Sequence, residues 1–270
     1  MGILNITPDS FSDGGQLYSE QAVNLDRVLR TAEKMLEDGA DILDIGGEST
    51  RPGAQPVSVD EELDRVIPVI EAIKQRLGIP LSLDSSSPEV ITAAAASGIA
   101  LINDVRALCR DRALQAASAT GLPVCLMHMQ GEPGTMQAQP TYMDVVCEVQ
   151  EFLQMRINAC LQAGIEKQNI LVDPGFGFGK TLEHNLALFR ALPQLADLGC
   201  PILVGVSRKR MIGAILSEKG VDRDLEGRLT GSVALAMLAA QRGASIVRVH
   251  DVKQTADALK VWAAVEKINK

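Results

Sequence analysis

Several apolar runs of this sequence end in short polar side chains, some of which are acids. Burying an acid costs free energy, so these positions call for an explanation. Asp84, Asn103 and Asp173 each close a short run rich in aliphatic residues. A carboxylate on a buried strand needs a donor-rich ligand or a cation, because burial without a partner is costly. A flat heterocycle with ring N–H and exocyclic amino groups would satisfy all three side chains. The alternative is that each acid pairs with a basic side chain or caps the next helix.

Basic residues gather after two later runs, although the whole chain has a net charge of −8. Ser207 is followed by Arg208 and Lys209, and Arg248 lies two residues before His250. Such a local concentration of cations predicts a binding site for phosphate or pyrophosphate. The alternative is a solvated basic face, with His250 in a structural hydrogen bond.

A glycine-rich segment, DPGFGFGK over 173–180, carries three alternating glycines and two of the chain's five phenylalanines. Such a loop can surround a planar ring, with Lys180 nearby. Its end matches the last part of the phosphate-binding pattern GxxxxGK[ST], but Pro174 stands where the first glycine belongs, which disfavours an ATP site. The alternative is a turn whose phenylalanines pack into the core.

Two further polar segments lie near the beginning of the chain. The segment 5–15, NITPDSFSDGG, predicts a mobile or metal-proximal loop; the alternative is a surface turn. The segment 46–53, GGESTRPG, combines glycines that allow close backbone approach with the charged fork of Arg51. The alternative there is a long loop that ends in a helix cap.

Eight apolar, β-prone runs alternate with segments of helical period and could position these residues. Eight strand–helix units favour one parallel (β/α)8 barrel, and we expect a single α/β domain over 1–270. The carboxyl ends of barrel strands meet at one face, so the polar residues should share one site. The predicted strands are 2–6, 41–45, 81–84, 101–104, 124–128, 170–173, 202–206 and 246–249. The predicted helical stretches are 22–36, 63–77, 143–163, 186–192, 235–239 and 258–265.

Composition sets the broad class of protein. A hydrophobic content of 46% supports one large core, and the acidic balance argues against nucleic acid or an anionic membrane as partner. The five cysteines are scattered without a CxxC pair, which predicts reduced thiols. No signal peptide or membrane-spanning run is visible, so we expect a cytoplasmic protein.

Taken in order, the segments resemble the signature blocks of the dihydropteroate synthase family. The matching blocks are MGILNITPDSFSDGG, GGESTRPG, INDV, LMHMQG, DPGFGFGK, SRKRMIG and VRVHDV, which span positions 1–252. The resemblance implies an enzyme that condenses 6-hydroxymethyl-7,8-dihydropterin pyrophosphate with p-aminobenzoate, releasing pyrophosphate in an SN1-like displacement. It also implies Mg2+ as cofactor, two small-molecule substrates, a homodimer and a sulfonamide target.

The resemblance assigns roles to individual residues. Asp84, Asp173, Lys209 and Asp13 would be catalytic, and Phe11 and Asp13 would belong to a mobile loop. Ser85-Ser86-Ser87 follows Asp84 where the family more often has Thr-Ser-Lys. The implied ligand contacts are Asp84, Asn103, Met127, Asp173 and Lys209 for the pterin; Asn5, Arg248 and His250 for pyrophosphate, with Asn5 touching Mg2+; and Thr50, Arg51, Pro52, Phe178, Ser207 and Lys209 for p-aminobenzoate.

Two other functions remain open. A pterin-binding barrel that transfers a methyl group from methyltetrahydrofolate to a corrinoid could share the acids, but it would not need the cations Arg248 and His250. A pterin-binding protein without catalysis is the third reading, although both polar loops and the anion site are present in the sequence.

Overall fold

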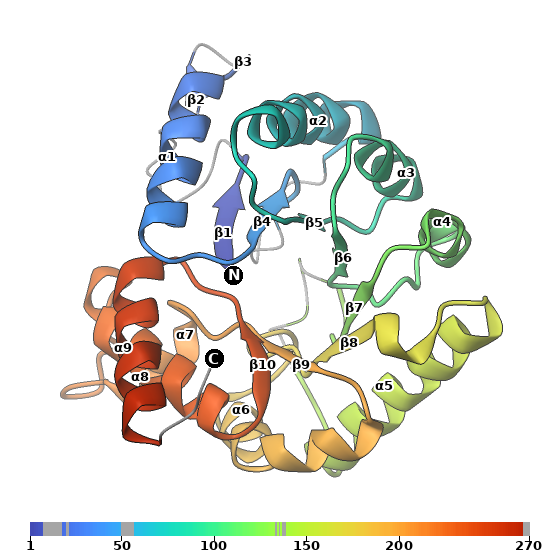
Figure 1. The fold of residues 1–270 in the computed structure, drawn as a ribbon. Coiled ribbons are helices and arrows are strands. Elements are labelled where there is room, and N and C mark those ends of the chain that lie inside the picture. Colours follow the sequence, from blue (N-terminus) through green and yellow to red (C-terminus); the bar gives the residue numbers. More distant parts are fainter. Residues whose placement is uncertain are drawn as a thin grey trace.

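The main sheet of the protein has eight parallel strands with helices between them (Figure 1). The computed structural model describes residues 1–7, 18–19, 22–49, 57–132, 134, 136 and 139–266. The strand order along the sheet follows the chain order, as the repeat of strand–helix units predicts. The strands are β1 (Gly2–Asn5), β4 (Leu43–Gly46), β5 (Leu81–Asp84), β6 (Leu101–Asp104), β7 (Val124–Met127), β8 (Ile170–Asp173), β9 (Ile202–Val204) and β10 (Ala244–Val247).

The two edges of the curled sheet come together at the end of the chain's last strand. The Ile3 amide donates to the Val249 carbonyl at 3.0 Å, and the Val249 amide donates to the Met1 carbonyl at 3.0 Å. The last strand was predicted at 246–249, but β10 covers Ala244–Val247 and so begins two residues earlier. A bulge between Ala244 and Ile246 admits one extra residue there and shifts the register against β9.

Helices cover the outside of the sheet. None of the helices in the described part of the chain is long and apolar enough to cross a membrane. A small antiparallel pair, β2 (Tyr18–Ser19) and β3 (Ala22–Val23), precedes the first helix and was not predicted. The α-helices are α1 (Leu25–Glu37), α2 (Val59–Arg76), α3 (Pro88–Ala96), α4 (Ala113–Thr120), α5 (Val145–Gln162), α6 (Leu182–Arg190), α7 (Arg210–Ile215), α8 (Leu229–Gln241) and α9 (Val252–Val265). Short 3-10 segments cover Lys167–Asn169, Leu192–Leu198 and Glu226–Arg228.

Side chains of each strand alternate between two hydrophobic clusters, and this alternation determines which polar residues face inward. On β7, Val124 and Leu126 belong to the large cluster under the helices, whereas Cys125 belongs to a small cluster with Met1 and Leu203. Successive side chains of a strand point to opposite faces. Residues in step with the small cluster therefore face the inside of the curled sheet. The polar residues and the methionine among them are Asn5, Asp44, Ser82, Asp84, Asn103, Met127 and Asp173.

Candidate active site

A cavity of about 1210 Å³ opens at the carboxyl ends of the strands. Its walls combine acids, bases and one aromatic ring from segments far apart in the sequence. Asn103, Met127 and Asp173 do not line it; they are buried in the adjacent strands, with exposed fractions of 3–5%. The predicted site residues that line the cavity are Asn5, Asp84, Phe178, Ser207, Lys209, Arg248 and His250.

Arg248 joins two inward-facing acids. Its Nε lies 2.5 Å from Asp44 Oδ2, and its Nη2 lies 2.7 Å from Asp84 Oδ2. Asn103 Nδ2 donates to the same Asp44 oxygen at 3.1 Å. Burial raises the pKa of Asp84 to about 7, and the charge of Arg248 opposes this rise. The acid and the cation predicted to bind different parts of a ligand are therefore in direct contact with each other.

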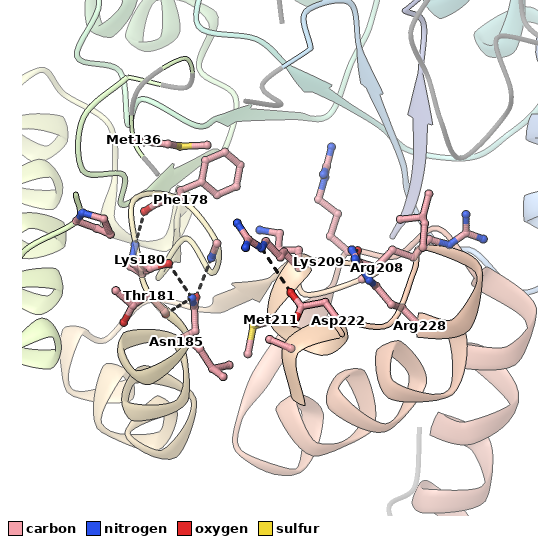
Figure 2. A pocket seen from close by; sticks show the side chains of 18 of the residues that line it. Met136, Phe178, Lys180, Thr181, Asn185, Arg208, Lys209, Met211, Asp222 and Arg228 are labelled. Carbon is pink, nitrogen blue, oxygen red and sulfur yellow. Dashed lines mark hydrogen bonds and ion pairs between the residues drawn. The ribbon is translucent and has the colours of Figure 1, made fainter. Parts of the chain in front are cut away.

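Asp173 and Lys209 act on each other electrostatically close to this cluster. Burial raises the pKa of Asp173, and the Lys209 ammonium opposes the rise. Burial also lowers the pKa of Lys209 to about 8, while Asp173 acts to raise it. Lys209 Nζ donates to the Phe176 carbonyl and lies 4.4 Å from the centre of the Phe178 ring. Lys209 thus lies beside the aromatic ring of Phe178 at the cavity (Figure 2).

The glycine-rich segment after β8 folds around the buried side chain of Lys180. Its Nζ donates to the carbonyls of Gly175 at 2.9 Å and Phe178 at 3.0 Å, and lies 2.9 Å from His128 Nδ1. Burial lowers the pKa of His128 to about 3, so this ring is neutral and can accept the bond. Gly175 has φ +69, and a Cβ there would lie 1.8 Å from the His128 carbonyl oxygen. Lys180 therefore holds the loop that carries Phe178.

The bases after β9 and β10 lie at one rim, as predicted, but they differ in their surroundings. Arg208 binds Asp251 through one edge of its guanidinium, donating from Nε at 3.0 Å and from Nη2 at 2.5 Å. Ser207 Oγ lies 3.0 Å from His250 Nδ1. Since Arg208 and Arg248 each pair with a carboxylate, the cluster carries less net positive charge than its sequence suggests.

Known proteins match this chain over almost all of its length. The family described as pterin binding enzyme matches residues 1–250. The dihydropteroate synthase of Haemophilus influenzae is 54% identical, covering 98% of this chain and 92% of the relative. That of Escherichia coli K12 is 53% identical, covering 98% and 90%.

The chain belongs to the dihydropteroate synthase family of pterin-binding enzymes. Solved structures of the family share its fold. The Yersinia pestis enzyme in complex with a sulfonamide drug has a TM-score of 0.92 at 52% identity, covering 99% of this chain and 94% of that chain. The Xanthomonas albilineans enzyme with 4-aminobenzoic acid has a TM-score of 0.89 at 50% identity, covering 100% and 93%.

The family resemblance implies a Mg2+ ion, but the described residues offer few side chains that could bind one. Within them, no three His, Cys, Asp or Glu side chains gather as a metal site. Asn5 ends β1 and lines the cavity, so its amide oxygen is available as one hard ligand. Mg2+ often completes its shell with water and substrate phosphate oxygens. The donor set therefore fits a metal that arrives with a diphosphate.

Several predicted residues lie outside the described part of the chain: Phe11, Asp13, Thr50, Arg51 and Pro52. Asp44 was not predicted as a site residue, although it contacts both Arg248 and Asn103. Its signal was the alternation of Leu43, Asp44 and Ile45 on a buried strand, which places the acid opposite its apolar neighbours. The contacts of Ser86 and Ser87 were also not predicted. These two serines form hydrogen bonds with other side chains and do not line the cavity.

Proposed function

We propose that this chain is a transferase that condenses 6-hydroxymethyl-7,8-dihydropterin pyrophosphate with p-aminobenzoate to give 7,8-dihydropteroate and pyrophosphate. The observation that carries the proposal is that the inward acid Asp84, which is bound to Arg248, lines the same cavity as the rim cations. The dihydropteroate synthase relatives support the same reaction. The Xanthomonas albilineans relative has been solved with 7,8-dihydropteroate itself.

In this proposal the pterin ring occupies the inner end of the cavity. Asp84 and Asp173 accept hydrogen bonds from its ring N–H and amino groups, and Lys209 donates to a ring acceptor. Asn103 and Met127 complete the pocket from the adjacent strands. Because Asp173 is buried and the Asp84 side chain is only 13% exposed, a ligand that supplies donors would satisfy oxygens that water reaches poorly. Binding would loosen the Asp84–Arg248 pair and make Arg248 available to the diphosphate.

The diphosphate occupies the rim, where Asn5, Arg248 and His250 line the cavity. Asn5 would contribute an oxygen to Mg2+, which supplies charge stabilisation for the departing pyrophosphate. Arg248 and His250 bind and orient the leaving group from the end of β10, which lies next to β1. The acids behind the ring stabilise the positive charge that develops on the pterin methylene.

p-Aminobenzoate approaches from the mouth of the cavity. Phe178 packs against its ring and Lys209 and Ser207 bind near its carboxylate, with Thr50, Arg51 and Pro52 from the segment after β4. The amine is already nucleophilic when neutral, so attack requires little general-base catalysis. Phe11 and Asp13 would close over the reaction and exclude water, which would otherwise hydrolyse the pterin cation.

We further propose one closed (β/α)8 barrel domain over 1–270, which the Ile3–Val249 backbone bond supports. A homodimer is supported by the exposed apolar side chains of α9: Val261 is 65% exposed and Val265 73%. A cytoplasmic location is part of the same proposal, and it rests on the sequence and on the substrates.

A coupled pyrophosphate-release assay with and without p-aminobenzoate tests the function. We expect release in the presence of Mg2+ that depends on p-aminobenzoate, with formation of 7,8-dihydropteroate. Pterin binding without turnover would instead support the hypothesis of a pterin-binding protein without catalytic activity. Methyl transfer from methyltetrahydrofolate, followed by a change in the corrinoid spectrum, would support the methyltransferase.

A further inference from the structure

Arg106 joins four consecutive loops at the carboxyl face of the sheet. Its side chain is only 11% exposed. Nη1 donates to Glu48 Oε2 at 3.2 Å and to Ser86 Oγ at 3.1 Å, and Nε lies 3.7 Å from Glu132 Oε2. These partners follow β4, β5 and β7, while Arg106 itself follows β6. One guanidinium therefore ties these four loops together at the rim of the cavity.

The backbone that delivers Arg106 is strained. Ala107 and Leu108 have φ values of +51 and +58, a left-handed region that residues other than glycine rarely adopt. Asp104 holds this turn by accepting from the amides of Arg106 at 2.8 Å and Leu108 at 2.7 Å. Arg156 of α5 donates to the Ala107 and Leu108 carbonyls at 2.9 and 3.2 Å. The turn is fixed from both sides, so its orientation of Arg106 is built in.

Glu48 is the partner that reaches the cavity, which it lines together with Ser49. Arg110 adds a second cation, with Nη2 3.6 Å from Glu48 Oε1. Gly47, the residue before Glu48, is also held tightly. Arg65 donates to the Gly47 carbonyl at 2.8 Å, and a Cβ on Gly47 would lie 2.8 Å from Val66 Cγ1. The segment from Gly47 to Ser49 is thus packed against α2 on one side and bound by arginines on the other.

Glu48 places a negative charge on the wall of a cavity that has to admit an anion. An unpaired carboxylate there would repel a carboxylate substrate, and interactions of this kind are strong where water is partly excluded. Arg106 and Arg110 neutralise Glu48 and hold it in place. This function is separate from that of the Asp84–Arg248 pair, which lies inside the sheet.

We propose that Arg106 is a positioning residue for the second substrate: it holds and neutralises Glu48 at the cavity wall, so that a benzoate anion can enter and bind. The inference rests on the proposed function. It applies to p-aminobenzoate rather than the pterin because Glu48 and Ser49 line the cavity wall after β4, whereas the acids proposed to bind the pterin lie on the inward face of the strands.

Steady-state kinetics of Arg106→Met test this. We expect KM for p-aminobenzoate to rise about tenfold, equivalent to about 1.4 kcal/mol. KM for the pterin pyrophosphate and kcat should each change less than about twofold, because the variant leaves the inner acids unchanged. Adding Glu48→Gln to Arg106→Met should lower KM for p-aminobenzoate again by at least about threefold, since it removes the unpaired charge.

Arg112→Met is the matched control. Arg112, from the same loop as Arg106, binds Glu89 of α3 at 2.8 Å in an exposed ion pair, and neither residue lines the cavity. Its kinetics should equal those of the wild type. Should Arg106→Met fail to fold, Arg106→Lys keeps the charge, loses the fork and should raise KM for p-aminobenzoate about threefold.

The outcomes separate the two proposals. A wild type that never releases pyrophosphate with p-aminobenzoate overturns the proposed function. A wild type that turns over, with KM for p-aminobenzoate unchanged in Arg106→Met, overturns only this inference. A fall in kcat that Glu48→Gln does not relieve also overturns it, since that pattern means general damage to the fold.

Discussion

Removing Arg248 should destabilise the protein more than removing an exposed arginine, because it leaves two buried acids without their cation. Arg248 contacts Asp44 at 2.5 Å and Asp84 at 2.7 Å, and Asp44 is fully buried. Breaking a buried ion pair by deleting one partner costs about 3–5 kcal/mol. We expect Arg248→Met to lower the free energy of unfolding by about this amount at about pH 8.

The loss should depend on pH through Asp84. The pKa of Asp84 is about 7 in the folded protein against 3.8 for the unperturbed group, and Arg248 keeps it from rising further. An acid whose folded pKa is raised contributes stability below its unfolded pKa and loses it as pH rises through the folded pKa. Below about pH 7 Asp84 is protonated in both proteins, so the difference between them widens above that pH.

Urea denaturation of wild type and Arg248→Met at about pH 5 and about pH 8 measures both effects. Arg76→Met is the control: it removes an exposed ion pair to Glu33 at 2.6 Å and should cost less than about 1 kcal/mol. Asp84→Asn added to Arg248→Met should recover part of the loss by removing one unpaired charge. Suppose that wild type and Arg248→Met differ in the free energy of unfolding by less than about 1 kcal/mol at pH 8, or that the difference narrows as pH rises. Arg248 then does not compensate the charges of Asp44 and Asp84.

Three further predictions concern the loop after β8 and the rim. Gly175→Ala should lower Tm strongly and abolish turnover, because its Cβ would lie 1.8 Å from the His128 carbonyl oxygen; Gly164→Ala, which also has positive φ but no atom within 4 Å, should lower Tm only slightly in the same thermal melt. Phe178→Ala should raise KM for p-aminobenzoate at least about fivefold in the pyrophosphate assay, through loss of about 1 kcal/mol of ring contact, and an unchanged KM would remove Phe178 from that site. EDTA should stop pyrophosphate release, and Asn5→Ala should raise the Mg2+ concentration at half-maximal rate; an Asn5→Ala titration that overlays the wild type would remove Asn5 from the metal site.

The buried strands were predictable because their apolar runs are short and closed by polar residues. The ranges 81–84, 101–104 and 170–173 agree with the structure to the residue. Helices α3 and α4 were not predicted from periodicity, since their alanine-rich sequences carry no clear apolar stripe. The last strand was misplaced because a bulge has no signature in the local pattern of Ala244 to Val249.

Site residues could be predicted as a set, but their partners could not. The strand ends and the family resemblance locate Asp84 and Arg248, yet the ion pair between them joins residues 164 positions apart. Lys180 was expected only to lie near a loop that surrounds a planar ring; in the structure its ammonium donates to carbonyls of that loop. The role of Arg106 was invisible because it depends on the left-handed turn at Ala107 and Leu108, which their side chains do not favour.

We propose that the inner acids bind a pterin ring and that the rim cations bind its diphosphate in one cavity. Calorimetric titration can measure these two contributions separately. The probes are 6-hydroxymethylpterin and its pyrophosphate ester, titrated with Mg2+ into wild type, Asp173→Asn and His250→Ala. We predict that Asp173→Asn weakens both ligands at least about tenfold, whereas His250→Ala weakens only the ester. Equal affinity of Asp173→Asn and wild type for the ring, or equal weakening of both ligands by His250→Ala, would contradict the account.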